Sequence, residues 1–372
     1  MKVCMISGAN QEEPYGSTIR PTYLAIYSAQ LGIEISHYGK NHPSIDEIVP
    51  GLNKQDISEE SLLRRFNSLY KELKHSPPDV IYTHQIQSGK LGLILSYFLH
   101  RPHVYDAHSS ISFEAPTFKN SPVQIRRRQF YYERMIIKLS SKVIVPSIEL
   151  KEFLIDKYRL NPDRFAIVKN GVERKRFFPL PPDESLRRNL GIEKDAFIVV
   201  ITNPRLPTFP SNDMALQYLF DVIPSIEKNV SRIKFLILGG GPELRPPSDN
   251  IIYTGYVNDI PSYINLADVC VVPYPAQAVC GGTRTKVCEY LACGKPIVAT
   301  EEGMRGFDDA VPGKHYFLAK NADDFIHYVI ECFNAPDKAK QIGENARQLS
   351  EKYDWSYLSR GLERCLSEVL SS

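Results

Sequence analysis

The stretch VCVVPYPAQAVCGGTRTKVCEYLACGKPIVAT, residues 269–300, contains an apolar run, a loop with two glycines, a helix-length segment and a second apolar run. The two runs, VCVVPY and PIVAT, have the length and the β-branched content of buried strands. A strand, a helix and another strand in this order are typical of a parallel βαβ unit. The stretch therefore predicts an α/β fold built on a parallel sheet.

The same alternation continues on both sides of this stretch. We expect strands at KVCMIS, GIEISHYG, DVIYTH, HVYDAH and KVIVPS in the first half, and at FIVVITN, KFLILGG, IIYTGY and YFLA in the second. Amphipathic segments of helix length, such as residues 19–30 and 125–140, lie between them. This pattern predicts two doubly wound parallel sheets.

The domain boundary is expected in residues 168–191, which contain an Asn-Gly turn, a proline cluster and a charged tail. We place an N-terminal Rossmann-like domain at residues 1–175 and a C-terminal one at residues 176–350. A helix at residues 351–372 is expected to pack back toward the N-terminal domain. A chain of 372 residues is also longer than one hydrophobic core usually organises.

The composition of the chain excludes several classes of protein. The 45 basic and 43 acidic residues leave a net charge of +2, which is not typical of a nucleic-acid-binding protein, so no nucleic-acid partner is expected. The seven cysteines lack CxxC spacing and lie mostly in apolar runs, which indicates reduced thiols. No run approaches the ~20 apolar residues of a spanning helix, and the N-terminal run is too short for a signal peptide. We therefore expect a cytoplasmic protein.

One basic segment, from Arg126 to Lys142, has three consecutive arginines followed by apolar residues and tyrosines. Such a segment can lie on an anionic membrane surface, as a peripheral contact on the inner face of the membrane. It can equally form a solvated helix face with ordinary ion pairs. The sequence leaves both interpretations open.

The turn before the helical part of the opening stretch is the first candidate site, because ligands of open α/β sheets bind beyond the carboxyl ends of strands. Gly281, Gly282 and Thr283 lie there, where glycines permit a close approach and a helix N-terminus favours an anion. Arg284 and Lys286 add positive charge. These residues predict a diphosphate site.

Glu289 lies one turn into the same helix, among apolar residues. A carboxylate in such company needs hydrogen-bond donors, and the two hydroxyls of a ribose would supply them. The alternative is a pair with Lys286 along the helix.

The segments VVPY and GGTRTKVCEYLACGKPIVAT resemble the donor-binding region of GT-B glycosyltransferases, in particular the large retaining family 4. VIVPSIELKEFLIDKYRLNPDRFAIVKNGVERKRFFP and IKFLILGGGPEL occur in the order that this resemblance requires. It extends from about Asp79 to Trp355. The resemblance implies two Rossmann-like domains facing across a cleft. It also implies transfer of a sugar from a UDP- or GDP-sugar to an acceptor hydroxyl with retention of configuration, without a cofactor or a metal.

Within this resemblance, Glu289 matches the second glutamate of the E-x7-E motif, which binds the donor ribose. The first glutamate, which contacts the sugar, should stand at the position of Gly281. Gly282 and Thr283 match the turn whose amides meet the sugar and phosphates. The remaining expected donor-binding residues are Gly16, Gly281, Arg284, Thr285 and Lys286.

Two residues are expected to take part in catalysis. His108 matches the histidine beside the donor sugar, and Arg205 can match the arginine that clamps the diphosphate. The departing phosphate takes the acceptor proton in such enzymes, so no strong general base is expected. Three other residues keep two interpretations each. Asp106 can orient His108 or cap an element, His84 can line the acceptor side or bond within a loop, and Arg20 can meet an acidic acceptor or lie solvated at the surface.

The expected partners are a nucleotide-sugar donor and a glycan, lipid-linked or small-molecule acceptor. Two alternatives share the fold and the nucleotide site. A sugar-nucleotide epimerase would turn over its substrate without an acceptor. A catalytically silent homologue acting as a binding subunit is favoured by the glycine at position 281. The run GGGP lacks the third glycine of a dinucleotide fingerprint, which argues against a dehydrogenase.

Overall fold

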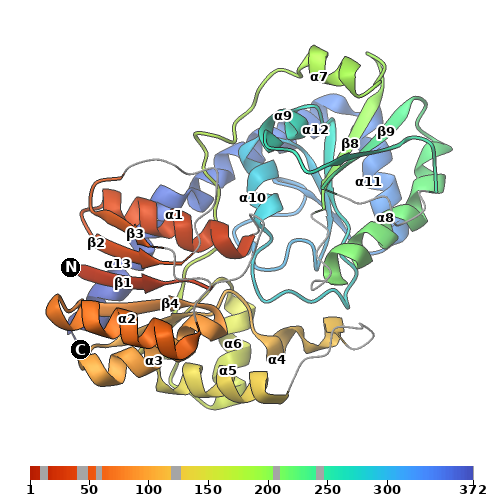
Figure 1. Cartoon of the computed structure of the whole chain (residues 1–372). Coiled ribbons are helices and arrows are strands. Elements are labelled where there is room, and N and C mark those ends of the chain that lie inside the picture. The colour runs from red at the N-terminus through yellow and green to blue at the C-terminus, as the bar shows by residue number, and fades with distance from the viewer. Residues whose placement is uncertain are drawn as a thin grey trace. The chain divides into compact units, whose positions relative to one another are not determined.

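The computed structural model describes residues 1–8, 16–39, 49–55, 61–118, 127–203, 210–239 and 247–371 of the chain. The chain forms two compact units (Figure 1). The first consists of Met1–Glu114, Ile125–Gly171 and Trp355–Ser372, and the second of Ala115–Gln124 and Val172–Asp354. Each unit is built around its own parallel sheet.

The sheet of the first unit has seven strands in the order β3-β2-β1-β4-β5-β6-β7. The strands are β1 Lys2–Ile6, β2 Glu34–Tyr38, β3 Leu52–Gln55, β4 Val80–His84, β5 His103–Asp106, β6 Lys142–Val145 and β7 Phe165–Ile167. All neighbours pair in parallel. The five strands predicted in this half are confirmed as β1, β2, β4, β5 and β6. The sequence did not indicate β3 or β7, because β3 is a polar edge strand and β7 has only three residues.

Helices cover both faces of this sheet. The longer ones are α1 Gly16–Gln30, α2 Leu62–His75, α3 Gln85–Leu99, α5 Arg127–Leu139, α6 Ile148–Tyr158 and α13 Trp355–Ser371. Val3 and Met5 of β1 pack in one core with α1 and α13, whereas the alternate residues Cys4 and Ile6 pack with α2 and α3. This separation follows from the two-residue period of a strand. The closing helix α13 contacts α1 in the first unit, where the Trp355 ring stacks on Tyr23.

The sheet of the second unit has six strands in the order β10-β9-β8-β11-β12-β13, all paired in parallel. They are β8 Phe197–Thr202, β9 Ile233–Leu238, β10 Ile251–Gly255, β11 Val269–Val272, β12 Ile297–Thr300 and β13 Phe317–Ala319. All six correspond to predicted strands. The main helices are α8 Pro210–Glu227, α9 Ile260–Asn265, α10 Thr285–Ala292, α11 Ala322–Asn334 and α12 Pro336–Leu349.

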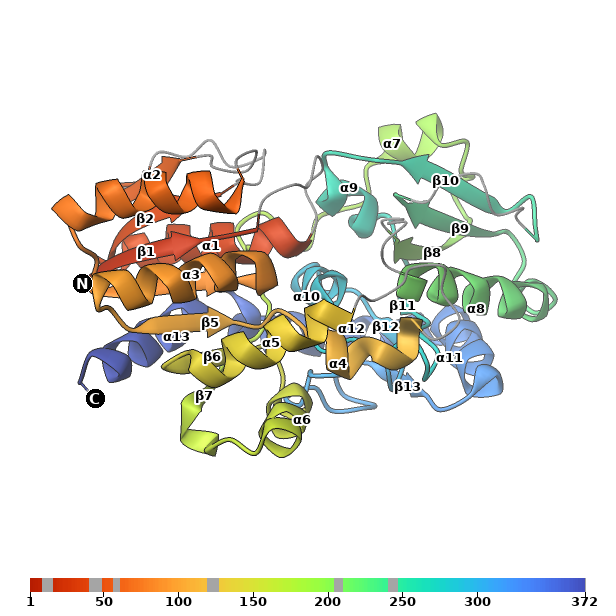
Figure 2. The same cartoon turned by 60° about the horizontal axis from the view of Figure 1, so that its bottom comes forward.

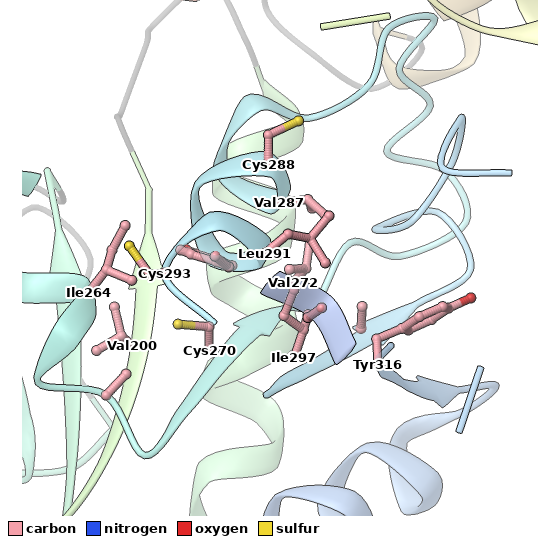
Figure 3. Close-up of a cluster of buried hydrophobic side chains, with 14 of the residues drawn as sticks. Val200, Ile264, Cys270, Val272, Val287, Cys288, Leu291, Cys293, Ile297 and Tyr316 are labelled. Atoms are coloured by element: carbon pink, nitrogen blue, oxygen red, sulfur yellow. The ribbon is translucent and has the colours of Figure 1, made fainter. Parts of the chain in front are cut away.

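The opening stretch forms β11, a loop, α10 and β12. The buried face of α10 contributes Val287, Cys288 and Leu291 to a core that also contains Val272 and Ile297 (Figure 3). The helix ends at Ala292, and two residues later the chain turns at Gly294, whose positive φ of 66° is unfavourable for any residue with a side chain. Packing on one side and this glycine at the end therefore fix both the orientation and the length of α10.

Candidate active site

A buried carboxylate, that of Glu302, holds the loop between β11 and α10 in the second unit. Its Oε1 accepts hydrogen bonds from the backbone N–H of Cys280 at 3.1 Å and from Nη2 of Arg284 at 3.2 Å. Its Oε2 accepts from Nε of Arg305 at 2.7 Å. Arg284 also donates to the carbonyl oxygen of Ala278 at 2.8 Å. One carboxylate and one guanidinium thus hold the second half of the loop, residues 278–284, against the segment that follows β12.

The side chain of Tyr274 connects this loop to two further helices. The guanidinium of Arg284 lies over its ring, 3.3 Å from the centroid. The Tyr274 hydroxyl accepts a hydrogen bond from Nζ of Lys286 at 2.7 Å and donates to Oδ1 of Asn212 in α8 at 2.6 Å. Both cations expected near the diphosphate therefore have partners inside the protein. Lys286 donates to Tyr274 and does not form the predicted alternative pair with Glu289.

The loop brings Gly281, Gly282 and Thr283, all buried, to the N-terminus of α10. Thr285 is the first residue of this helix. The positive end of the helix dipole favours an anion at this place. The glycine pair, the threonine and the helix start are therefore side by side in the second unit, as the sequence predicted for a diphosphate site.

Glu289 lies on α10, one turn after this N-terminus, and is partly exposed. Among the described residues, no side chain or backbone group donates a hydrogen bond to its carboxylate. Burial raises the pKa of Glu289 to about 7, against the opposing charges of Lys286 and Arg176. Such a carboxylate has unused acceptor capacity and would gain from a ligand with hydroxyl donors.

A second polar cluster lies at the carboxyl ends of β4 and β5 in the first unit. Asp106 is fully buried and accepts hydrogen bonds from Nε of Arg20 at 3.1 Å and from Nη2 at 3.0 Å. The hydroxyl of Tyr82 also donates to it. Arg20 donates further to the carbonyl oxygens of Val168 and Lys169. Arg20 is only 1% exposed, so the prediction of a solvated surface arginine is wrong: burial is possible because Asp106 supplies the counter-charge.

Two histidines extend this cluster. Nδ1 of His84 lies 2.7 Å from Nε2 of His108, so the two rings share a hydrogen bond. Asp106 lies 3.7 Å from His84 Nδ1 and 3.9 Å from His108 Nε2. Burial lowers the pKa of His84 well below its usual range and that of His108 to about 4. Both imidazoles are therefore neutral at pH 7. His84 is buried behind His108, whose side chain is 14% exposed.

The ligand atoms of His84, Asp106 and His108 lie within 4.8 Å of one another, as a metal site would require. However, the carboxylate already accepts from a guanidinium and a phenol, and the positive charge of Arg20 opposes a second cation. The histidine nitrogens also bond to each other. The donor set fits a hydrogen-bonded cluster better than a metal centre.

The structure gives little information on two other predicted residues, Arg205 and Gly16. Arg205 falls outside the described residues. Gly16 is the first residue of α1, directly after the undescribed residues 9–15.

Two family models match the chain. Glycosyltransferase Family 4 matches residues 33–176, and Glycosyl transferases group 1 matches residues 200–335. The chain belongs to glycosyltransferase family 4. It is a retaining glycosyltransferase that takes its sugar from a nucleotide sugar, and the predicted GT-B fold is confirmed.

Similar proteins agree with this assignment. The glycosyltransferase is 24% identical to the D-inositol 3-phosphate glycosyltransferase of Frankia alni over 92% of each chain. It is also 24% identical to an Escherichia coli enzyme, UDP-Gal:alpha-D-GlcNAc-diphosphoundecaprenol alpha-1,3-galactosyltransferase, over 63% of this chain and 60% of the relative. Its fold is similar to that of Anabaena HepE, solved in complex with UDP and glucose, with a TM-score of 0.77, 18% identity and coverage of 99% and 100%.

Several residues of the glycosyltransferase's candidate sites were not singled out from the sequence. Tyr274 and Glu302 each lie two residues after the end of a strand. The reasoning that selected the glycine turn, that ligands bind beyond the carboxyl ends of strands, therefore also applied to them. The partnership of Glu302 with Arg284 could not be inferred, because it depends on how two strand ends meet. The same holds for Tyr82, whose hydroxyl reaches Asp106 across neighbouring strands.

Proposed function

We propose that the glycosyltransferase transfers a sugar from a UDP-sugar to a hydroxyl of a glycan or lipid-linked acceptor. In this proposal Gly281, Gly282 and Thr283 hold the diphosphate, and Glu289 binds the ribose. His108 lies beside the sugar. The observation that carries the donor assignment is the partly exposed Glu289 carboxylate, without a hydrogen-bond donor among the described residues, one turn from the helix start.

The donor base and the acceptor are supported to different degrees by the related proteins. HepE was solved with UDP, and the E. coli relative is named for UDP-Gal, which favours a uridine nucleotide here. The acceptors in the relatives' names differ, since one is an inositol phosphate and the other a sugar on diphosphoundecaprenol. Both are hydroxyl compounds with phosphate groups, which fits a hydroxyl acceptor.

Charge on the departing diphosphate would be stabilised mainly by the N-terminus of α10, because this dipole is aligned before the reaction begins. Arg284 and Lys286 act through the loop: their bonds to Glu302 and Tyr274 keep the glycine turn in place. We propose Arg205 as the remaining cation for the phosphates. The departing phosphate takes the proton of the acceptor.

His108 would act as a neutral hydrogen-bonding group. Its Nε2 is engaged by His84, which leaves Nδ1 for a hydroxyl of the sugar or the acceptor. A neutral imidazole can donate or accept at that atom without adding charge. His84 and Asp106 would position His108 without touching the substrate.

The glycosyltransferase has no helix among the described residues that is long and apolar enough to cross a membrane. We propose a cytoplasmic location with a peripheral contact to the inner face of the membrane through the segment from Arg126 to Lys142. A lipid-linked acceptor would be reached there.

Glu289→Ala is expected to weaken UDP binding at least roughly tenfold, because the ribose hydroxyls lose their acceptor, a change of about 1.4 kcal/mol. Isothermal titration calorimetry with UDP measures this. Glu344→Ala, an exposed carboxylate on α12, is the matched control and should leave the affinity unchanged. An unchanged dissociation constant for Glu289→Ala would refute the ribose assignment.

His108→Ala is expected to reduce turnover of the UDP-sugar far more than UDP affinity, because the residue is proposed to act beside the sugar. UDP release with and without acceptor, measured beside calorimetry, separates the two effects. Equal losses would show that His108 is only structural. An epimerase would interconvert UDP-sugars without acceptor, and a silent homologue would show no turnover in the unmodified protein.

A further inference from the structure

Helices α2, α3 and α5 lie side by side over one face of the seven-stranded sheet (Figure 2). They have 14, 15 and 13 residues in a chain of 372. The described chain has fifteen exposed large apolar side chains, and seven of these belong to the three helices. The seven are Leu62, Leu63, Ile94, Tyr97, Phe98, Tyr131 and Leu139. Exposed apolar side chains are therefore concentrated on this layer.

Part of this apolar surface is a packed aromatic group between α2 and α3. The ring of Phe98 lies 5.4 Å from Phe66 and 5.9 Å from Tyr70, measured between centroids, and Tyr97 meets its edge. Tyr97 and Leu63 are each 75% exposed. A contiguous exposed group of this kind usually marks an interaction surface.

The same three helices have an excess of positive charge. They contain nine lysines and arginines and only two acidic residues, Glu72 and Glu133. Glu133 is buried and bonded to Ser110 and Tyr158. Because the whole chain has a net charge of only +2, the rest of the protein is net negative. The positive charge is thus a local property of this layer.

Cations and apolar side chains are both exposed on α5. Arg127, Arg128, Arg134 and Lys138 are exposed there, together with Tyr131 and Leu139. Aliphatic and aromatic side chains surrounded by lysine and arginine are typical of helices that lie in a membrane interface. A binding surface for nucleic acid would need the cations without so many exposed aliphatic side chains.

We infer that the layer of α2, α3 and α5 docks on the surface of an anionic phospholipid bilayer. The cations meet the lipid headgroups, and the apolar side chains enter the boundary between headgroups and acyl chains. This inference rests on the membrane contact of the proposed function, which it extends from the α5 segment to three helices. It does not depend on the proposed roles of residues in sugar transfer.

Vesicle flotation with the full chain tests this inference. One set of vesicles is phosphatidylcholine alone, and the other is phosphatidylcholine with phosphatidylglycerol in equal parts. The protein should float with the anionic vesicles and not with the neutral ones, and added salt should weaken this binding by screening. Equal flotation with both sets, or with neither, would overturn the inference.

Paired variants locate the surface. Arg127→Glu with Arg128→Glu, and separately Leu63→Ser with Tyr97→Ser, should each weaken binding to anionic vesicles roughly tenfold or more. Lys340→Glu on α12 and Tyr357→Ser on α13 are matched controls at exposed positions and should bind like the unmodified protein. If the patch variants bind as well as the controls, the assigned face is wrong.

UDP calorimetry in the absence of vesicles accompanies each of these variants. All four should keep their UDP affinity, since none of the substituted residues belongs to the donor site. A protein that binds UDP but not anionic vesicles would refute the membrane surface alone. A protein that binds vesicles but not UDP would refute the donor assignment alone.

Discussion

Asp106→Ala is expected to destabilise the first unit by about 3–5 kcal/mol. The Asp106 carboxylate is fully buried, and so is the Arg20 guanidinium that donates to it. Removing the carboxylate leaves a positive charge in the interior without a counter-charge, and the hydroxyl of Tyr82 also loses its acceptor. Urea unfolding at pH 7, followed by circular dichroism, measures the loss.

Asp195→Ala is the control for this experiment. Asp195 pairs with Arg232, but both side chains are well exposed, so the expected loss is below about 1 kcal/mol. The double substitution Asp106→Leu with Arg20→Met should cost less than Asp106→Ala alone, because no charge is left unpaired. A loss for Asp106→Ala no larger than that for Asp195→Ala would show that the buried pair is not the source of stability.

Glu302→Ala is expected to cost the second unit a similar amount, about 3–5 kcal/mol. Arg284 would keep its buried position, with its side chain 6% exposed, but would lose its counter-charge. The backbone N–H of Cys280 would also lose its acceptor. Because this amide precedes the glycine turn, UDP affinity of the folded variant should fall roughly tenfold as well. Urea unfolding and UDP calorimetry give the two values.

Two further variants distinguish the effect of the Glu302 charge on stability from its effect on the position of the glycine turn. Glu302→Gln keeps an acceptor for Cys280, so it should retain more UDP affinity than Glu302→Ala. Glu351→Ala removes an exposed partner of Arg174 and should change stability by less than about 1 kcal/mol. If Glu302→Ala is destabilised and still binds UDP with native affinity, Glu302 does not position the glycine turn.

The sequence predicted the sheets well, because buried parallel strands form distinct apolar runs. The two strands that it missed, β3 and β7, lack such a run. The position of α10 was also predictable, from the glycine turn before it and the glycine after it. In each case the signal lies within a few neighbouring residues.

The buried pairs were not predictable in the same way. Arg20 and Asp106 are 86 residues apart, and nothing in the local pattern of either residue indicates its partner. His84 and His108 lie at the carboxyl ends of neighbouring parallel strands, so the sequence indicated that they would be close together. It did not indicate that the two rings bond directly, because that depends on side-chain directions set by the whole core.

The bonded histidine pair has a consequence for the acid–base behaviour of the enzyme. Exposed histidines ordinarily change charge between pH 5 and 8. Burial keeps the pKa of His108 at about 4 and that of His84 well below its usual range, so the pair stays uncharged across this interval. Glu289, with a pKa of about 7, is the proposed site residue that gains a charge there as the pH rises. Sensitivity to mild acidity is therefore expected at Glu289, the proposed ribose-binding residue, whereas His84 and His108 keep the same charge over this interval.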